Sequence, residues 1–511
     1  MTGVLGRRPL FPAISSKGYS MSEKTILAYD FGTTGLKAAV FSFDGTLLAR
    51  DTVNLRLYVP HEGYAEQDPE EYWSALVAAT SKVLALCRPA DIAGVCLCAQ
   101  WKGIIPVDRN GKVLRRSLIW MDTRAADQAA RLNEITGSRF FSAQNYWAKL
   151  RWCHENNPEI FEEATDIMEV GSFIKWRLTG EKAVDISNDF IHSYDSQTDA
   201  FYDRNVRLSG MDKAKFPALD QSTDKVGEVN EWASEVTGIP KGVPVFSGSG
   251  DIPAITIGSG CQRVGKVHAY FGTSGWVGGV FEHDHSNVFR ASSGFTKDRD
   301  IRLIRSLRSI GSSLDWTVRQ LYHGEYENLK QNVYDVVNEE IADVPAGSAG
   351  VMATPWIAGM HAPMSDMART VFIGLSLKHD RRHIINAMME GICMDMRLGY
   401  VNNPVSCIAA VGGGANSDHW MQILSDVLQT EVSVPFNNQH AGALGAAACA
   451  LVGLGEFDSL DQASVFVKER KHFYPDASKA GLYSELTELY CNLYKPLEPT
   501  FMKLNEMKGG Y

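Results

Sequence analysis

Short apolar runs separated by polar turns mark the chain after Met21. The runs ILAYD at residues 26–30 and LKAAVFS at residues 36–42 are typical of buried strands, and FGTTG between them has the composition of a tight turn. A third run, TLLARDTV at residues 46–53, follows the turn dipeptide Asp44–Gly45. The pattern therefore predicts three consecutive strands joined by two tight turns.

A helix and another strand are expected next. Asp68 precedes Pro69 and two glutamates, which is a typical helix start because it combines a side-chain cap, a first-turn proline and first-turn acids. Residues 72–87 then place apolar side chains at helical spacing. Residues 92–100, IAGVCLCAQ, form an apolar run typical of a buried strand.

The second half of the chain repeats this plan. KVHAYFG at residues 266–272 and WVGGVFE at residues 276–282 predict a strand, a turn and a strand, and residues 408–428 predict a strand, a glycine turn and a helix. Residues 440–455 predict a helix of small residues suited to close packing. The turn FGT[TS]G occurs twice, at an offset of 271 − 31 = 240 residues. One repeat of this length implies two related lobes with a cleft between them.

The expected organisation is thus a mixed α/β chain in three parts. Residues 1–22 are expected to be a disordered extension without the apolar core of a secretory signal. Residues 23–250 would form the N-terminal lobe and residues 251–511 the C-terminal lobe.

Composition narrows the classes of partner. The chain has 511 residues and a formal net charge of −10, which argues against nucleic acid or an anionic membrane as the main partner. No apolar run reaches the roughly 18–20 residues of a membrane helix. The nine cysteines are scattered, and Cys96 and Cys98 fall in an apolar run, so buried reduced thiols and a reducing cytoplasm are expected.

Both turns carry the chemistry of an anion site. Glycines expose backbone N–H groups and hydroxyls add donors, so two such turns facing each other would grip a polyphosphate from both sides. The alternative for each copy alone is an ordinary hairpin turn. The turn residues are Gly32, Thr33 and Thr34 in the first copy and Gly272, Thr273 and Ser274 in the second.

Asp251 follows a predicted strand at residues 243–246 and a glycine turn at residues 247–250, and it starts a predicted helix. It is interpreted as the helix N-cap or as a general base, and the two roles can coexist. At a helix start its carboxylate is expected to stay ionised.

Several motifs together resemble the FGGY carbohydrate kinases, and within that family most nearly the xylulose kinases. The resemblance runs in order over about residues 24–500. Its motifs are the run from Leu27 to Phe41, EQDPE at 66–70, WMDTR at 120–124, GSGD at 248–251, YFGTSG at 270–275, VGGGANSDHW at 411–420 and GALGAA at 442–447. It implies two actin-like, ribonuclease-H-like lobes with ATP and Mg²⁺ in the cleft and a small sugar or polyol against the N-terminal lobe.

The resemblance also implies a role for each matching residue. Asp251 would be the catalytic base, and Asp30 the acid beside the Mg²⁺–phosphate site. The cofactor-binding residues would be Gly32, Thr33, Thr34 and Lys37 around the first turn, Gly272, Thr273 and Ser274 in the second, Gly311 and Asp315 near the nucleotide, and Gly413, Gly414 and Asn416 at the adenosine.

The substrate-binding residues implied by the resemblance are Gln100, Trp101, Lys102, Asp251 and Ile252. The chain departs from xylulose kinases mainly in this region. Trp101 and Lys102 follow Gln100 in place of a Met-His pair, and Ile252 replaces an asparagine after Asp251. The loop from Gly359 to Pro363 lacks the family's acid and base. A pocket that bonds particular hydroxyls discriminates strongly, so a changed substrate preference is expected. The alternatives to a substrate-binding role are core packing for Trp101 and a solvent-exposed charge for Lys102.

Three functions follow from these observations. The first is a kinase that transfers the γ-phosphate of ATP to a hydroxyl of a ketose or polyol. The second is a sugar- or nucleotide-sensing protein that has lost turnover, and the third is an actin-like ATPase acting on proteins. The oligomeric state is left open, a homodimer included.

Overall fold

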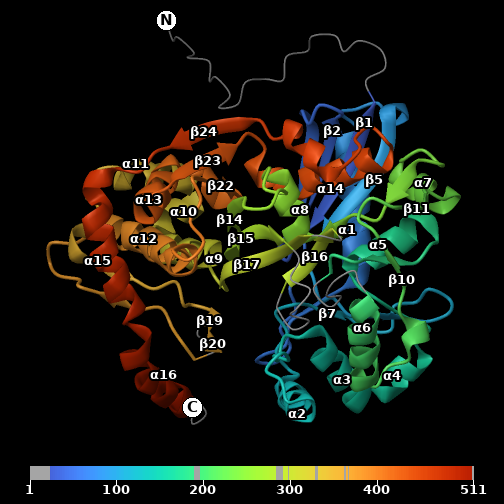
Figure 1. Cartoon of the computed structure of the whole chain (residues 1–511), viewed down its shortest axis with the longest axis horizontal. Coiled ribbons are helices and arrows are strands. Elements are labelled where there is room, and N and C mark those ends of the chain that lie inside the picture. Colours follow the sequence, from blue (N-terminus) through green and yellow to red (C-terminus); the bar gives the residue numbers. More distant parts are fainter. Residues whose placement is uncertain are drawn as a thin grey trace, which may run out of the picture.

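The computed structural model describes residues 24–188, 196–282, 292–296, 299–328, 332–361, 364–365 and 367–508. The extension at residues 1–22 lies outside the described residues, and so do Ala362 and Pro363. Figure 1 shows two α/β parts side by side, one mainly from the blue and green first half of the chain and one from its yellow to red second half.

The first lobe is built around a mixed sheet. Its described strands run in the order β11, β12, β5, β1, β2 and β3, and β13 pairs with the end of β5. Strands β1, β2 and β3 are antiparallel, whereas β1, β5 and β12 are parallel. The bounds are β1 Thr25–Phe31, β2 Gly35–Ser42, β3 Leu47–Asn54, β5 Ile92–Ala99, β11 Lys225–Glu228, β12 Pro244–Phe246 and β13 Ser249–Gly250.

The second lobe repeats this strand order. Its described strands run β16, β17, β15, β14, β22, β23 and β24, with β17, β15 and β14 antiparallel and β14, β22 and β23 parallel. The predicted repeat is therefore a repeat of sheet topology, with β14 and β15 in the places of β1 and β2. The bounds are β14 Val267–Phe271, β15 Gly275–Glu282, β16 Ser292–Thr296, β17 Arg299–Leu307, β22 Cys407–Val411, β23 Glu431–Pro435 and β24 Glu469–Phe473.

The two hairpins nevertheless close in different registers. Phe31 pairs with Leu36 across the first turn, whereas Phe271 pairs with Gly275 across the second. At an offset of 240 the counterpart of Leu36 is Trp276, so the second hairpin is one residue tighter. Sequence identity in the turn did not reveal this difference.

Alternation of side chains along β1 decides what covers each face of the first sheet. Successive strand side chains point to opposite faces. Tyr29 belongs to a core shared with helix α1, Pro69–Leu84, whereas Ala28 belongs to a core shared with helix α14, Ala441–Gly453. The unbroken apolar run in this strand thus reflects burial on both faces.

Helix α14 comes from the second half of the chain but packs on the first sheet (Figure 1). It crosses helix α8, Asp251–Gly258, at small residues. A Cβ atom on Gly258 would lie 1.9 Å from the Ala441 carbonyl oxygen, and one on Gly445 would lie 1.9 Å from that of Ala254. The close packing predicted for this helix is confirmed.

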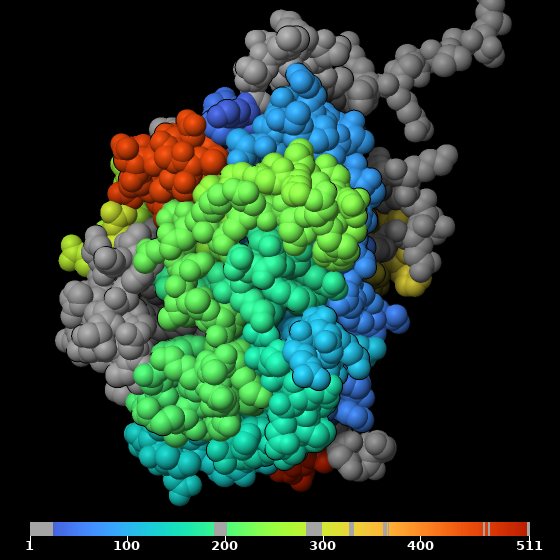
Figure 2. Space-filling view, turned by 90° about the vertical axis from the view of Figure 1, so that its right-hand side faces the viewer, coloured from blue at the N-terminus to red at the C-terminus, as the bar shows by residue number. Residues whose placement is uncertain are grey.

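A later segment also reaches the first lobe. Lys468 Nζ lies 3.1 Å from Asp44 Oδ2, and Asn437 Nδ2 donates a hydrogen bond of 3.3 Å to the Gly45 carbonyl. In Figure 2 an orange-red region from late in the sequence lies beside the blue and green surface of the first lobe. The two halves of the sequence are therefore not two separate bodies.

The remaining helices cover the other faces of the lobes. In the first lobe α5 and α7 join α1 on its face, and α2, α3 and α6 share a separate apolar core (Figure 1). Their bounds are α2 Ala126–Thr136, α3 Tyr146–Asn156, α4 Pro158–Glu163, α5 Val170–Thr179, α6 Ser196–Ser209 and α7 Glu231–Thr237. Those of the second lobe are α9 Gly311–Leu321, α10 His323–Asn328, α11 Val333–Ile341, α12 Arg381–Tyr400, α13 Asp418–Leu428, α15 Ala480–Cys491 and α16 Tyr494–Lys508.

Short strand pairs complete the described fold outside the two large sheets. Their bounds are β4 Glu66–Gln67 with β7 Ser117–Leu118, β6 Ile105–Val107 with β8 Asp166–Met168, β9 Ala183–Asp185 with β10 Ala218–Asp220, β18 Met352–Ala353 with β21 Phe372–Ile373, and β19 Met360–His361 with β20 Met364–Ser365.

Most local predictions are confirmed. The three opening strands are present, and Asp68 caps α1 by accepting a hydrogen bond of 3.0 Å from the Glu70 N–H. All nine cysteines are free thiols, with Cys96 and Cys98 buried. The turn predicted at residues 247–250 is wrong in part, because Ser249–Gly250 pairs with β5 as a short strand. No described helix is both long enough and apolar enough to cross a membrane.

Candidate active site

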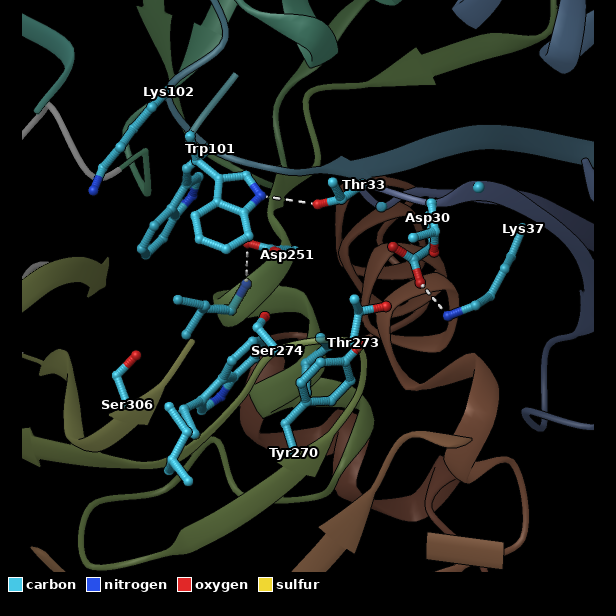
Figure 3. A pocket seen from close by; sticks show the side chains of 18 of the residues that line it. Asp30, Thr33, Lys37, Trp101, Lys102, Asp251, Tyr270, Thr273, Ser274 and Ser306 are labelled. Carbon is cyan, nitrogen blue, oxygen red and sulfur yellow. Dashed lines mark hydrogen bonds and ion pairs between the residues drawn. The ribbon is translucent and has the colours of Figure 1, made fainter. Parts of the chain in front are cut away.

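Residues of both glycine-threonine turns line one cavity of about 280 Å³. Figure 3 shows Asp251 between its two ends, with Asp30 and Lys37 toward one end and Trp101 and Lys102 toward the other. The predicted site residues that line the cavity are Asp30, Gly32, Thr33, Thr34, Lys37, Trp101, Lys102, Asp251, Ile252, Thr273 and Ser274.

The first turn is held by side chains behind it. The Thr33 hydroxyl donates to Gln100 Oε1 at 3.2 Å and accepts from Trp120 Nε1 at 2.8 Å, while Gln67 Nε2 donates to the Thr33 carbonyl at 2.8 Å. Gln100 in turn donates to Gln67 at 2.6 Å. Gln100, predicted to contact the substrate, is buried and does not line the cavity; it fixes the turn instead.

The second turn is held by the start of α9. The Gly311 N–H donates to the Gly272 carbonyl at 2.9 Å, and the Ile310 and Ser312 N–H groups donate to the Thr273 carbonyl at 3.1 and 3.3 Å. A Cβ atom on Gly311 would lie 2.5 Å from the Gly272 carbonyl oxygen, which accounts for a glycine at that position. Gly272 and Gly311 thus shape the turn without lining the cavity.

Asp30 lies where the two lobes meet. Its Oδ2 forms an ion pair of 3.2 Å with Lys37, its cross-strand neighbour on β2. A Cβ atom on Gly442, in the first turn of α14, would lie 2.9 Å from Asp30 Cγ, so the glycine makes room for the carboxylate. In the second hairpin an aromatic pair stands in its place, since Tyr270 stacks on Trp276 with ring centroids 4.2 Å apart.

Asp251 is the first residue of α8, and Gly250 is the N-cap, so the interpretation of Asp251 as a cap is wrong. Its Oδ1 accepts a hydrogen bond of 2.9 Å from the Ile252 N–H. Burial, reinforced by the negative charge of Asp30, raises the pKa of Asp251 from 3.8 to about 7. The expectation that this carboxylate stays ionised at the helix start is therefore wrong, because loss of hydration on burial outweighs the backbone hydrogen bond. A pKa near neutrality is the value that suits a general base.

Trp101 is both packed in the core and part of the cavity wall. Its side chain is 9% exposed and belongs to the core that α14 shares with the first sheet. Its Nε1 is buried and has no hydrogen-bond partner among the described residues. The core-packing and substrate-side interpretations therefore both hold geometrically.

Lys102 takes a backbone conformation that is unusual outside glycine, with φ = 66°. The buried Lys149 supports it by donating hydrogen bonds of 2.8 Å to the carbonyls of Lys102 and Ile119. Burial lowers the pKa of Lys149 to about 7. A neutral amine still has two N–H groups, enough for both carbonyls, so this support does not depend on the charge.

Besides Gly272 and Gly311, four more residues assigned to the nucleotide lie outside this cavity. Asp315 on α9 forms an ion pair of 2.7 Å with Arg319. Gly413, Gly414 and Asn416 belong to one short 3₁₀ turn after β22, which Asn438 joins by donating to Asn416 Oδ1 at 3.2 Å.

Other lining residues were not identified from the sequence. Trp120 lines the cavity from the motif WMDTR, and nothing in that motif indicated a role for the indole. Leu303 and Ser306 come from β17, where no motif marks them. Leu307, next to Ser306, lines the cavity as well. A register shift between β15 and β17 lies between Leu303 and Ser306 and interrupts the alternation of faces there.

Comparisons with known proteins agree with this geometry. The model of the FGGY family of carbohydrate kinases, N-terminal domain, matches residues 25–258, and that of the C-terminal domain matches residues 268–454. The chain is 27% identical to a xylulose kinase of Bacillus subtilis (strain 168), over 92% of this chain and 97% of that protein. It is 24% identical to a gluconokinase of Bacillus licheniformis, over 94% of this chain and 97% of that protein.

A solved structure supports the same assignment. The crystal structure of xylulose kinase from Rhodospirillum rubrum matches with a TM-score of 0.78 and 26% identity, over 94% of this chain and 100% of that chain. This likeness confirms the predicted fold of two actin-like α/β lobes. The chain belongs to the FGGY family of carbohydrate kinases, which are phosphotransferases with a hydroxyl group as acceptor.

Proposed function

We propose that the protein transfers the γ-phosphate of ATP to a hydroxyl group of a ketose sugar, as a xylulose kinase does. The observation that carries the proposal is that Asp251, with a pKa raised to about 7, shares one cavity with the two hydroxyl-rich turns. The acceptor hydroxyl would thus have a base on its side of the cavity, and the transferred phosphate would have hydrogen-bond donors on the other side.

The phosphate end of the cavity would bind the transferred group. Thr33, Thr34, Thr273 and Ser274 line it from opposite lobes, and their backbone N–H and hydroxyl groups are suited to phosphate oxygens. Lys37 adds a positive charge close to Asp30. Catalysis of phosphoryl transfer is mostly alignment and charge stabilisation, which this arrangement would supply.

Magnesium fits the same end. The described residues contain no cluster of three or more His, Cys, Asp or Glu side chains that would cage a metal. Nucleotide-bound Mg²⁺ needs no such cage, because it usually keeps waters and takes one or two carboxylates together with the phosphates. Asp30 would be that carboxylate, and the bound ion would neutralise phosphate charge.

Asp251 would act on the acceptor. Its carboxylate would take the proton of the sugar hydroxyl while the hydroxyl oxygen forms a bond to the γ-phosphorus. The bond between that phosphorus and the bridging oxygen of ADP breaks in the same transfer. Trp101 and Ile252 flank Asp251 and would exclude water, the competing nucleophile.

The substrate side favours a second candidate, a sugar or polyol other than xylulose. Ile252 and Trp101 offer no carboxylate or amide to a hydroxyl, and Lys102 lines the cavity with a cationic side chain that suits hydroxyls or an acid group. A gluconokinase stands among the relatives, so sugar acids belong in the test.

A substrate panel with coupled detection of ADP tests the proposal. The protein would be assayed with ATP and Mg²⁺ against xylulose, other ketoses, polyols and gluconate. We expect ADP release that depends on one of these substrates and is abolished by Asp251→Asn. ATP binding with no turnover of any substrate would contradict the proposal and favour a sensing role.

A further inference from the structure

Buried polar groups hold the turn before Asp251 from behind. We propose that Asp185, acting through the Ser187 hydroxyl, is a positioning residue that fixes the start of α8 and thereby aims Asp251. The inference rests on the proposed role of Asp251 as the base.

The turn itself lies tightly against its neighbours. Gly248 has φ = 69°, and a Cβ atom there would lie 1.8 Å from the Leu97 carbonyl oxygen. A Cβ atom on Gly250 would collide with the Trp101 indole. Side chains at these two positions are therefore excluded, and backbone groups must carry the hydrogen bonds that place the turn.

Ser187 supplies one of those hydrogen bonds. The Gly250 N–H donates to Ser187 Oγ at 3.1 Å, and Ser187 Oγ donates to Asp185 Oδ1. The Ser187 N–H also donates to Asp185 Oδ1, at 2.9 Å. A hydroxyl has a single hydrogen, so the carboxylate that takes it leaves the oxygen lone pairs for the Gly250 N–H. Asp185 thus sets the direction of the contact to Gly250.

Asp185 is itself fixed. It is 3% exposed, it ends strand β9, and its Oδ2 accepts a hydrogen bond of 2.7 Å from Asn188 Nδ2. Burial raises the pKa of Asp185 to about 6, against the opposing effect of the positive charge of Lys175. The carboxyl is therefore mainly ionised at neutral pH and acts as a hydrogen-bond acceptor.

Lys175 holds the other end of the same turn. This fully buried side chain on α5 donates to the Ser247 carbonyl at 3.1 Å and to the Ser247 hydroxyl at 3.2 Å. The turn is thus anchored at both ends by buried groups of opposite charge, one from α5 and one from β9. Such an anchor suits a general base, because the distance between its carboxylate and the acceptor hydroxyl oxygen must be held to within a fraction of an ångström.

The test compares two buried serines whose hydroxyls each donate one hydrogen bond and accept one from a backbone N–H. Ser209, on α6, donates to the Val206 carbonyl at 2.7 Å and accepts from the Met211 N–H at 3.3 Å, so its bonds do not involve the turn before Asp251. With the substrate found in the panel, Ser187→Ala is expected to lower kcat about 10- to 100-fold. The KM for ATP should stay within about twofold, because alignment and not binding is lost. Ser209→Ala should leave kcat unchanged.

A conservative pair of variants at Asp185 gives an independent measurement. Asp185→Asn keeps an acceptor for the Ser187 hydroxyl. Its new amide can donate to Asn188 Oδ1 after that side chain flips, since this oxygen has no partner among the described residues. Asp185→Asn should therefore retain a higher kcat than Asp185→Ala. If Ser187→Ala unfolds below the assay temperature, this pair of variants still tests the positioning role of Asp185.

Three results would each overturn the inference in an active parent protein. The first is an equal kcat for Ser187→Ala and Ser209→Ala, and the second is a loss confined to KM. The third is an equal kcat for both Asp185 variants and the parent. A parent protein with no turnover would overturn the proposed function and this inference with it. An active parent whose variants fail these tests would overturn this inference alone.

Discussion

The indole nitrogen of Trp101 lies directly against Gly250, the residue before Asp251. A Cβ atom on Gly250 would lie 1.5 Å from Nε1, closer than any two non-bonded atoms can approach. The contact joins the 101–102 loop to the start of α8 across the cavity wall. It gives a physical reason for glycine at a position that the sequence marks only as part of a turn.

Gly250→Ala should therefore damage both stability and turnover. The added methyl must displace the indole or the turn, and overpacking of this kind typically costs about 1–3 kcal/mol. Thermal unfolding and kcat with the panel substrate measure the two effects. Gly481→Ala in α15 is the matched control, because a Cβ atom there meets nothing within 4 Å. Adding Trp101→Phe to Gly250→Ala should recover part of the lost stability, and a purely additive double mutant would contradict the contact.

The activity should depend on pH through Asp251. Its pKa of about 7 means that the carboxylate form, which can accept a proton, is present mainly above pH 7. The rate kcat/KM should rise with pH and level off above that point. In Asp30→Asn the residual activity should show its rise at lower pH, because the charge of Asp30 helps to raise the pKa. An unshifted profile would show that burial alone sets the value.

The same carboxyl should cost stability when it ionises. The pKa of Asp251 is higher in the folded protein than its ordinary value of 3.8, so the folded state binds more protons between about pH 4 and pH 7. Stability therefore falls as pH rises through this range. Asp251→Asn lacks the titration and should melt on the order of 2 °C higher than the parent at pH 8, with no difference at pH 4. Differential scanning fluorimetry at both values measures this, with the surface variant Asp203→Asn as control. A difference independent of pH would contradict the shift.

The two hairpins should differ in their sensitivity to mutation. Asp30→Ala removes a carboxylate that lines the cavity, pairs with Lys37 and contacts α14, whereas Tyr270→Phe keeps the stack on Trp276. We expect Asp30→Ala to lower kcat about 100-fold or more and Tyr270→Phe to change it less than about threefold. Steady-state kinetics at saturating ATP and Mg²⁺ decide the question, and equal losses would contradict the assignment of the metal to one lobe.

Local patterns predicted the opening strands, the capped helix α1 and the repeat of the two lobes, because each depends on spacing and composition within a short stretch. What could not be predicted depends on distant contacts. The raised pKa of Asp251 comes from burial and from Asp30, more than 200 residues away in the sequence. The hydrogen bond between Thr33 and Gln100 likewise joins residues that are distant in the sequence, and no local pattern indicates it.

The site shows the same division. The motif residues Thr33 and Thr273 meet in one cavity as expected, but Leu303 and Ser306 come from β17, where no motif marks them and a register shift with β15 interrupts the alternation of faces. The one-residue difference between the hairpins is likewise invisible in nearly identical turn sequences, because pairing register is set by neighbouring strands as well as by the turn.

The position of α14 has a consequence for dissecting the protein. This helix belongs to the second half by sequence and to the first sheet by packing. A gene cut at codon 251 would encode a first fragment whose sheet has lost the cover of one face, including the neighbours of Ala28 and Cys98. Such a fragment would expose a large apolar surface and would be prone to aggregate when it is expressed alone. Complementation from two plasmids would require the two fragments to associate before this aggregation occurs.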